Sequence, residues 1–387
     1  MEKVLAKRAF IPTALALCAA LLASAAALAQ ELPVLGPKPF ISYFQPTPIV
    51  GALSASAWGA ATVGPRDPDN GLEDRTLVQW NYWDGVILKA PDGSYRMFGS
   101  RWEQAKGHGE WWNSKAVVAA SPKLTGPYVD RGLLWPDNGD GRGHNVVALR
   151  LRDGTYAVII SETRNTTVFV SNSVDGPWRF SGEIAVDQSR FHSLRDAGSD
   201  GGDLTGPNPK PWHGSNVNIV ERAGGGFLLI QRSGQILVSE KSLLGPYKVA
   251  GDSIYRGLPG MPQSDLGHLE DPAIWFSGGW YHVLVNNWSQ RRAYHLISRD
   301  GVTGWKFQGL AYEPGADFIR YTNGVVNHWN KLERPGVVLE NGHVVALTFA
   351  VIDVPKEEQT TGSRHGSKVI VVPFDGAALD KDLASVR

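Results

Sequence analysis

The chain has 387 residues, of which 42% are hydrophobic, 20% charged and 10% aromatic. Lys and Arg together number 38, as do Asp and Glu, so the formal net charge is zero. This balance excludes the strong positive field that would attract the whole protein to nucleic acid or to an anionic membrane. The 44 Gly and 24 Pro favour many turns and few helices.

The first residues have the pattern of a secretory signal peptide. Three basic residues precede an apolar run that ends in small residues before Gln30. We expect residues 1–29 to be a signal peptide and residues 30–387 to be the exported protein, periplasmic or secreted and without a membrane anchor. The single cysteine, Cys18, lies in the apolar run. The mature protein is therefore predicted to contain neither disulfides nor thiolate metal ligands.

After Gln30 one unit recurs about every sixty residues. Each copy has a Val-, Ile- or Leu-rich strand, a Gly turn and a second strand that begins near an aromatic residue. The predicted strand pairs are 83–88 with 95–98, 144–147 with 156–159, 215–219 with 227–229, 270–274 with 281–284, and 333–337 with 344–347. Their turn glycines follow at nearly even spacing: Gly93, Gly154, Gly225, Gly279 and Gly342.

Radial repetition of such short-stranded units is typical of a β-propeller. Five units of about sixty residues fill the mature chain, whereas seven would need more residues than it has. We therefore predict an all-β fold, a five-bladed β-propeller that forms a single catalytic domain. The segment Phe40–Val63 is expected to supply strands that help to close the ring beside the last blade.

In a propeller the innermost strands all begin at one mouth of the central channel, so the residues at their starts converge. These starts carry Asp84, His144, Asn145, His213, Asn216, His268, Glu270, Asp271, His328, Glu333 and Arg334. The ends of the second strands return to the same mouth and carry Arg101, Trp102, Glu162, Arg164, Arg232 and Trp288.

An insertion after the second strand of the first unit contains His108, Trp111 and Trp112, and in this interpretation it can form one wall of the mouth. Tryptophan faces stack on sugar rings, carboxylates and Asn bind hydroxyls, and Arg binds acidic substituents. The whole set therefore predicts a substrate-binding pocket for a poly- or oligosaccharide, with no role for nucleic acid.

Three motifs carry a resemblance to a known family: Trp83-Asp84-Gly85, Leu269-Glu270-Asp271-Pro272 and Leu332-Glu333-Arg334-Pro335. With them, and with the Gly-Pro-aromatic elements of the blades, the chain resembles the five-bladed glycoside hydrolases of the arabinanase, levansucrase and invertase type, in particular family 43-like proteins. The resemblance implies that Asp84 is the general base or nucleophile, that Asp271 tunes the acid and that Glu333 is the general acid.

The order of these groups along the chain departs from the family pattern. That pattern takes its carboxylates from the first three blades, whereas blades two and three here present His144-Asn145 and Ser215-Asn216. Hydrolysis of a glycosidic bond needs two carboxylates, one to protonate the leaving oxygen and one to activate water or attack carbon. Asp84 together with Glu333 or Glu270 can satisfy that requirement, and His144 is a further catalytic candidate.

Two alternatives stay open. A polysaccharide lyase would cleave next to a uronic acid by β-elimination, and the residues suited to that chemistry are His144, His213, Arg164, Arg232 and Tyr82. A non-catalytic glycan-binding propeller is the second alternative. No dinucleotide fingerprint, phosphate loop or Gly-x-Ser-x-Gly element occurs, so no cofactor is expected. Imidazoles converging on an axis can ligate a divalent cation in the central channel, but no local histidine pair indicates one.

Overall fold

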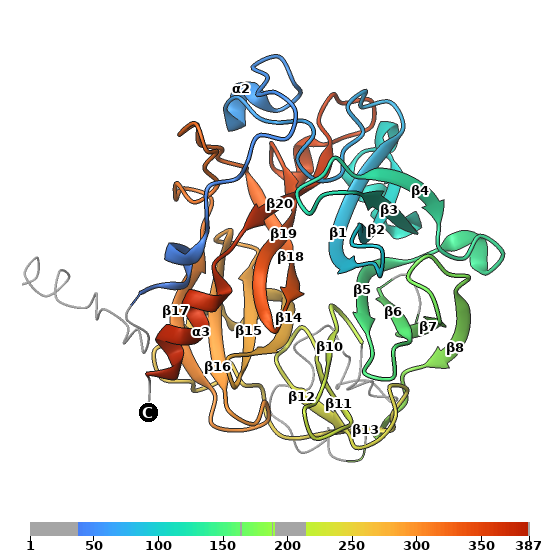
Figure 1. Cartoon of the computed structure of the whole chain (residues 1–387), viewed down its shortest axis with the longest axis vertical. Helices are drawn as coiled ribbons and strands as arrows, with labels where there is room; N and C mark the ends of the chain where they lie inside the picture. Colours follow the sequence, from blue (N-terminus) through green and yellow to red (C-terminus); the bar gives the residue numbers. More distant parts are fainter. Residues whose placement is uncertain (1–37, 163–164, 188, 190–213, 386–387) are drawn as a thin grey trace, which may run out of the picture. The chain divides into compact units, whose positions relative to one another are not determined.

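Five sheets stand around one axis in the computed structural model, which describes residues 38–162, 165–187, 189 and 214–385 (Figure 1). The predicted signal peptide, residues 1–29, lies outside the described residues. The first sheet contains β1 (Trp80–Lys89), β2 (Tyr95–Glu103), β3 (Lys115–Ser121) and β4 (Val129–Leu133). The second contains β5 (His144–Arg150), β6 (Tyr156–Ser161), β7 (Thr167–Ser171) and β8 (Arg179–Glu183).

The remaining sheets repeat this antiparallel order with small variations. The third contains β10 (Asn218–Glu221), β11 (Phe227–Ile230), β12 (Ile236–Ser239) and β13 (Tyr247–Val249), with β9 (Val186–Asp187) parallel to β13 at its edge. The fourth contains β14 (Leu269–Ser277), β15 (Trp280–Asn287), β16 (Arg292–Ser298) and β17 (Lys306–Tyr312). The fifth has three strands, β18 (Lys331–Glu340), β19 (His343–Ile352) and β20 (Ser367–Pro373).

The innermost strands form the ring. Each of β1, β5, β10, β14 and β18 contacts the next, and β18 contacts β1. The predicted five-bladed propeller is therefore confirmed, and each of the five predicted strand pairs is an antiparallel hairpin.

Apolar side chains fill the space between neighbouring sheets. Phe98 and Ala116 of the first sheet pack with Val158 and Phe169 of the second in one buried cluster. Burial of such side chains supplies the main favourable free energy of folding, and further buried clusters lie between other neighbouring sheets.

The helices of the described residues are short and lie before the first strand, in connections between strands, or after the last strand. They are η1 (Phe40–Tyr43), α2 (Ala60–Val63), η2 (Gln104–Lys106), η3 (His108–Asn113), η4 (Gly139–Gly141), η6 (Gln263–His268), η7 (Lys356–Glu358) and α3 (Gly376–Ala384). Within the described residues no helix combines the length and the apolar character needed to cross a membrane.

The ring closes differently from the prediction for Phe40–Val63. That segment forms η1, α2 and isolated bridges, such as Phe44 with Phe374, instead of strands. Pro46 and Pro48 lack the backbone N–H that a strand ladder needs, which explains the difference.

The outer edge of β20 is covered by residues that come after this segment. Leu72 exchanges two backbone hydrogen bonds with Val369, of 2.9 and 3.0 Å. The Asn70 side chain makes two more with the backbone of Val371, both of 2.9 Å. Residues 70–72 thus take the place of a fourth strand in the last blade.

A buried ion triad fastens the same segment to β20. Glu73 binds Arg66 through two hydrogen bonds of 2.6 and 2.8 Å and Lys368 of β20 at 2.7 Å. The three side chains are at most 2% exposed, and the Arg66 guanidinium lies 4.5 Å from the ring centroid of Trp58. Because each charge has a partner inside the protein, the triad avoids the penalty of an unpaired buried ion.

Two imidazoles of the fourth sheet are buried against each other. His282 Nδ1 lies 2.9 Å from His295 Nε2, and the ring of Trp275 stacks nearly parallel on His282 at 4.7 Å. Burial lowers the pKa of His282 to about 3 and lowers the pKa of His295 well below its usual range. Both side chains are therefore neutral in the folded protein at neutral pH.

The free energy of unfolding is expected to fall as the pH is lowered below about 6.5, the pKa of histidine in an unfolded chain. Below that value the unfolded chain binds protons at these imidazoles and the folded chain does not, so stability present above pH 6.5 is lost toward acid. Each group contributes up to ~1.4 kcal/mol per pH unit. Urea unfolding of His282→Gln across this range should give a shallower pH dependence than wild type, whereas the exposed control His328→Gln should not. Equal slopes for all three would contradict the prediction.

Candidate functional site

One backbone feature recurs in every blade at the mouth of the channel. Each innermost strand has, within its first five residues or just before its start, a residue with a left-handed φ between 45° and 66°: Asp84, Asn145, Asn216, Asp271 and Arg334. Asn and Asp tolerate this conformation better than other non-glycine residues do. In four strands the pairing register shifts at this point, which marks a β-bulge. Bulges re-aim side chains next to functional sites.

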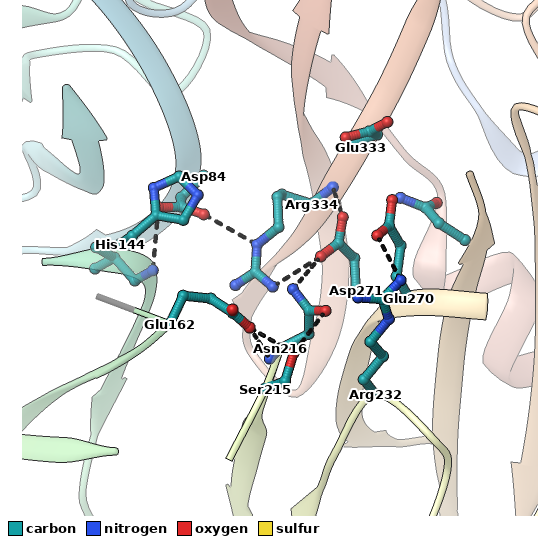
Figure 2. Close-up of polar contacts among 12 residues, drawn as sticks. Asp84, His144, Glu162, Ser215, Asn216, Arg232, Glu270, Asp271, Glu333 and Arg334 are labelled. Atoms are coloured by element: carbon teal, nitrogen blue, oxygen red, sulfur yellow. Dashed lines mark hydrogen bonds and ion pairs between the residues drawn. The ribbon is translucent and has the colours of Figure 1, made fainter. Parts of the chain in front are cut away.

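Four of these five residues form a continuous hydrogen-bonded belt (Figure 2). The Arg334 guanidinium donates to Asp84 at 2.9 Å and to Asp271 at 3.1 Å, and Asn216 donates to Asp271 at 2.9 Å. All four side chains are buried. Charge-assisted bonds of this kind fix the geometry of the mouth and balance the two buried carboxylates.

A cavity of about 170 Å³ opens on this belt. Its walls combine aromatic rings, carboxylates and cations from all five blades, together with residues of two connecting loops. The lining residues are Trp83, His108, Trp111, His144, Asn145, Glu162, Asn216, Arg232, Glu270, Asp271, Glu333, Arg334 and Lys356. A few convergent polar groups beside aromatic walls are typical of a site for a polar ligand.

The environments of Glu270 and Glu333 drive the pKa values of these two carboxyls in opposite directions. Burial raises the pKa of Glu270, and the charges of Asp271 and Glu333 raise it further. Burial alone would also raise the pKa of Glu333, but ion pairs with Lys356 and Lys331 lower it. When the pair holds one proton, that proton is on Glu270. The Arg232 guanidinium lies 3.4 Å from a carboxylate oxygen of Glu270.

Asp84 lies below this cavity instead of lining it. It accepts hydrogen bonds from Ser100 at 2.7 Å and from the backbone N–H of Val146 at 3.1 Å, in addition to the bond from Arg334. Its side chain is 1% exposed and borders a separate small hollow in the channel. In this arrangement Asp84 supports the floor of the site, a different position from that expected for a general base.

His144 is held as a neutral imidazole on the wall. Its Nδ1 lies 3.0 Å from Ser114 Oγ, and Ser114 donates its own hydroxyl proton to the carbonyl of Gly143. Nδ1 must therefore carry the proton, and Nε2 is left as an acceptor. Burial and the charge of Arg334 lower the pKa of His144 to about 3, and Trp111 packs on the ring at 4.8 Å.

His108 is fixed in a similar way on the other side of the aromatic wall. Its Nδ1 contacts Gln359 Oε1 at 3.1 Å, and its ring meets Trp83 edge-on at 5.1 Å. Burial and the nearby Lys356 lower the pKa of His108 to about 3.

The structure brings together most of the residues that the sequence predicts for the site. The ten that line the cavity are His108, His144, Asn145, Glu162, Asn216, Arg232, Glu270, Asp271, Glu333 and Arg334. Two further candidates, Arg164 and His213, lie outside the described residues.

Arg101 and Trp102, at the end of β2, do not line the cavity. Arg101 pairs with Asp130, and its guanidinium carbon lies 4.2 Å from the ring centroid of Trp80. Alternate side chains of a strand point to opposite faces of the sheet, and Arg101 points away from the cavity. The Trp102 indole is buried and donates to the carbonyl of Gly107 at 3.1 Å. Tyr82, named for the lyase alternative, donates to Asp130 at 2.9 Å and is likewise buried outside the cavity.

His268, Trp288 and His328 also lie outside the cavity lining. His268 and Trp288 pack edge-on against each other at 5.2 Å, and His328 is exposed, with Nε2 3.3 Å from Asp317. His144 directly precedes the left-handed residue of its blade, whereas His328 lies six positions before Arg334. Positions in different blades are equivalent when they lie at the same distance in sequence from the bulge. Histidines at other distances from the bulge therefore do not converge on the cavity.

The sequence interpretation omitted two lining residues, Trp83 and Lys356. Lys356 belongs to η7, in the loop between β19 and β20, where it pairs with Glu333 and lies 5.1 Å from the ring centroid of Trp83. No repeat signal marks this loop. Trp83 directly precedes the left-handed Asp84, as His144 precedes Asn145, so the bulge position is the signal that could have identified it.

Three carboxylates of the cavity form a group that can offer oxygens to a cation. Glu270, Asp271 and Glu333 can each place one oxygen within 4.8 Å of the others, and none of the described histidines belongs to this group. Arg334 binds Asp271, and Lys356 binds Glu333. The donor set is thus already neutralised by protein cations, so these residues do not fit a dedicated metal site well.

The sequence matches no protein-family model and no curated protein. Solved structures share the fold. An α-L-arabinofuranosidase from Podospora anserina, in complex with cellotriose, is 11% identical over 80% of this chain and 95% of that chain, with a TM-score of 0.54. A family 117 glycoside hydrolase of the marine bacterium Zobellia galactanivorans is 11% identical over 79% and 88%, with a TM-score of 0.51.

A third structure, described as a glycoside hydrolase, is 14% identical over 79% of this chain, with a TM-score of 0.50. The chain spans 61% of the length of that protein. The protein described here therefore has the five-bladed propeller fold found in glycoside hydrolases, as its sequence motifs predict.

Proposed function

We propose that this protein is a glycoside hydrolase that cleaves a poly- or oligosaccharide in the cavity above the belt. The observation that carries the proposal is the opposite shift of the pKa values of Glu270 and Glu333, two carboxyls that line one cavity. Pairs of titratable groups whose environments separate their pKa values are the usual acid and base partners of such sites. The fold shared with solved glycoside hydrolases supports the same class of reaction.

In this proposal Glu270 is the general acid. It holds the proton of the pair and gives it to the glycosidic oxygen as the bond to the anomeric carbon breaks. Glu333, ionised beside Lys356 and Lys331, is the second carboxylate, which activates water or attacks the anomeric carbon. The roles differ from the expectation that Asp84 is the base and Glu333 the acid, because Asp84 is enclosed beneath the cavity.

The aromatic and amide groups of the cavity are proposed to hold the sugar. The faces of Trp83 and Trp111 offer apolar contact to ring C–H groups, while Asn145 and Glu162 can bind hydroxyls. Arg232, next to Glu270, can place its charge near the leaving oxygen or an acidic substituent.

The test is to incubate the purified protein with plant, algal and bacterial polysaccharides and to record two signals. Reducing ends that appear without new ultraviolet absorbance are expected, because hydrolysis forms no double bond. Absorbance of an unsaturated uronate would overturn the proposal in favour of β-elimination. If the polysaccharides bind without any bond cleavage, the protein is instead a glycan-binding propeller.

We also propose that the protein is exported, on the basis of residues 1–29. Mass spectrometry of the protein from its natural host should give a first residue of Gln30. An intact N-terminus would contradict export by cleavage at that position.

A further inference from the structure

We infer that Trp112 is a platform on the rim of the cavity for a sugar residue outside it, so that the substrate is a glycan chain and not a small glycoside. This inference rests on the proposed function and extends it. The argument starts from the limited size of the cavity and from the exposure of this indole.

The cavity is small for a ligand that must lie wholly inside it. Its volume of about 170 Å³ is below the roughly 300–1,000 Å³ of pockets that enclose a drug-sized ligand. It has room for one ring-sized group. Any further residue of a longer glycan must therefore lie beyond the rim.

An aromatic stack leads from the cavity wall to the surface. Trp111 packs on His144 at 4.8 Å inside the site, and Trp112 stacks on Trp111 with ring centroids 4.0 Å apart and planes 24° apart. Trp111 lines the cavity, whereas Trp112 is 52% exposed. One face of Trp112 is covered by Trp111, and about half of the side chain stays open to solvent, where a ligand ring can reach it.

Polar contacts fix the backbone of the short helix η3, which carries this indole. Arg142 donates to the carbonyl of Trp112 at 2.9 Å, and Asn113 donates to Glu110 at 3.1 Å. Lys106 pairs with the same Glu110 at 3.2 Å. These contacts hold the backbone at Trp112, while the ring itself stays 52% exposed next to Trp111.

Sugar rings present apolar C–H faces that stack on indoles, with polar hydroxyls at the edge. The exposed part of Trp112 offers such a ring a contact outside the cavity, next to the Trp111 wall. Continuity with the Trp111 wall favours the same glycan chain as the occupant over a separate molecule.

The test measures binding apart from cleavage. Native gels that contain soluble arabinan, galactan or xylan are run with the Glu270→Gln protein, in which cleavage is expected to be slow. We expect at least one polymer to retard this protein and the added change Trp112→Ala to lower its apparent affinity about tenfold. Phe180→Ala is the matched control, because Phe180 is also 52% exposed but belongs to the outer strand β8. It should leave retardation unchanged.

Activity gives a second measurement. In the protein with intact Glu270, Trp112→Ala should raise KM on the longer oligosaccharides by a larger factor than it raises KM on an aryl monoglycoside. The platform would be overturned if the Trp112→Ala and Phe180→Ala proteins were retarded equally, or if no polymer retarded the protein. In either case, hydrolysis of short glycosides would still support the proposed function. Retardation that depends on Trp112 without release of reducing ends would overturn the proposed hydrolase and leave the platform.

Discussion

Replacing Glu270 by glutamine is expected to lower kcat by about 10²–10⁴-fold on glycosides whose leaving group needs a proton, the range typical of general acid catalysis. Glutamine keeps the size of the side chain and removes the acidic proton. On a dinitrophenyl glycoside, which leaves readily as an anion, the loss should be far smaller. Comparison of kcat on the two substrates measures the role of Glu270 as the acid.

Glu333→Gln is expected to slow both substrates, because the second carboxylate is needed whatever the leaving group is. Glu340→Gln is the control, since Glu340 lies on the same strand β18 but pairs with Lys89 at 2.6 Å outside the cavity.

In the wild-type protein, activity should fall at alkaline pH as Glu270, with its raised pKa, loses its proton. An equal loss on both substrates for Glu270→Gln would remove Glu270 from the role of acid.

Arg334→Met is expected to lower the free energy of unfolding by about 3–5 kcal/mol at neutral pH, the cost of breaking a buried ion pair. Methionine replaces the packing volume of the stem but leaves Asp84 and Asp271 buried without their shared cation. The exposed Arg131→Met, in β4, should change stability little. Urea unfolding of both variants at neutral pH is the measurement. An unfolding free energy of the Arg334→Met protein equal to that of the Arg131→Met protein would contradict this prediction.

The sequence allowed the blades to be predicted because each hairpin repeats the same turn glycine and the same alternation of strand residues. It also predicted that Asp84, Asn145, Asn216, Asp271 and Arg334 meet at one mouth, since all five occupy the start of an innermost strand. The contacts among them could not be predicted. A carboxylate can face the cavity or be enclosed by Arg334. Which of the two occurs depends on the neighbouring bulge that carries the arginine.

Residues outside the repeat were harder to predict. Lys356 comes from a loop with no counterpart in the other blades, yet it determines the charge state of Glu333. His328 shares only its residue type with His144, and its offset from the bulge leaves it at the surface. Repeat patterns therefore predict which strand carries a residue, whereas the bulge decides where its side chain lies.

The closure of the ring has a consequence for how the protein folds. Asn70 and Val371, which pair across the last blade, are 301 positions apart in the sequence. Contacts of such long separation slow folding, because loop entropy is lost before the contact can form. The hairpins can form early and locally, but the seam between residues 70–72 and β20 must wait for the rest of the chain. Variants that weaken Leu72 or Asn70 should thus speed unfolding more than they slow hairpin formation, and the seam is where the ring should open first.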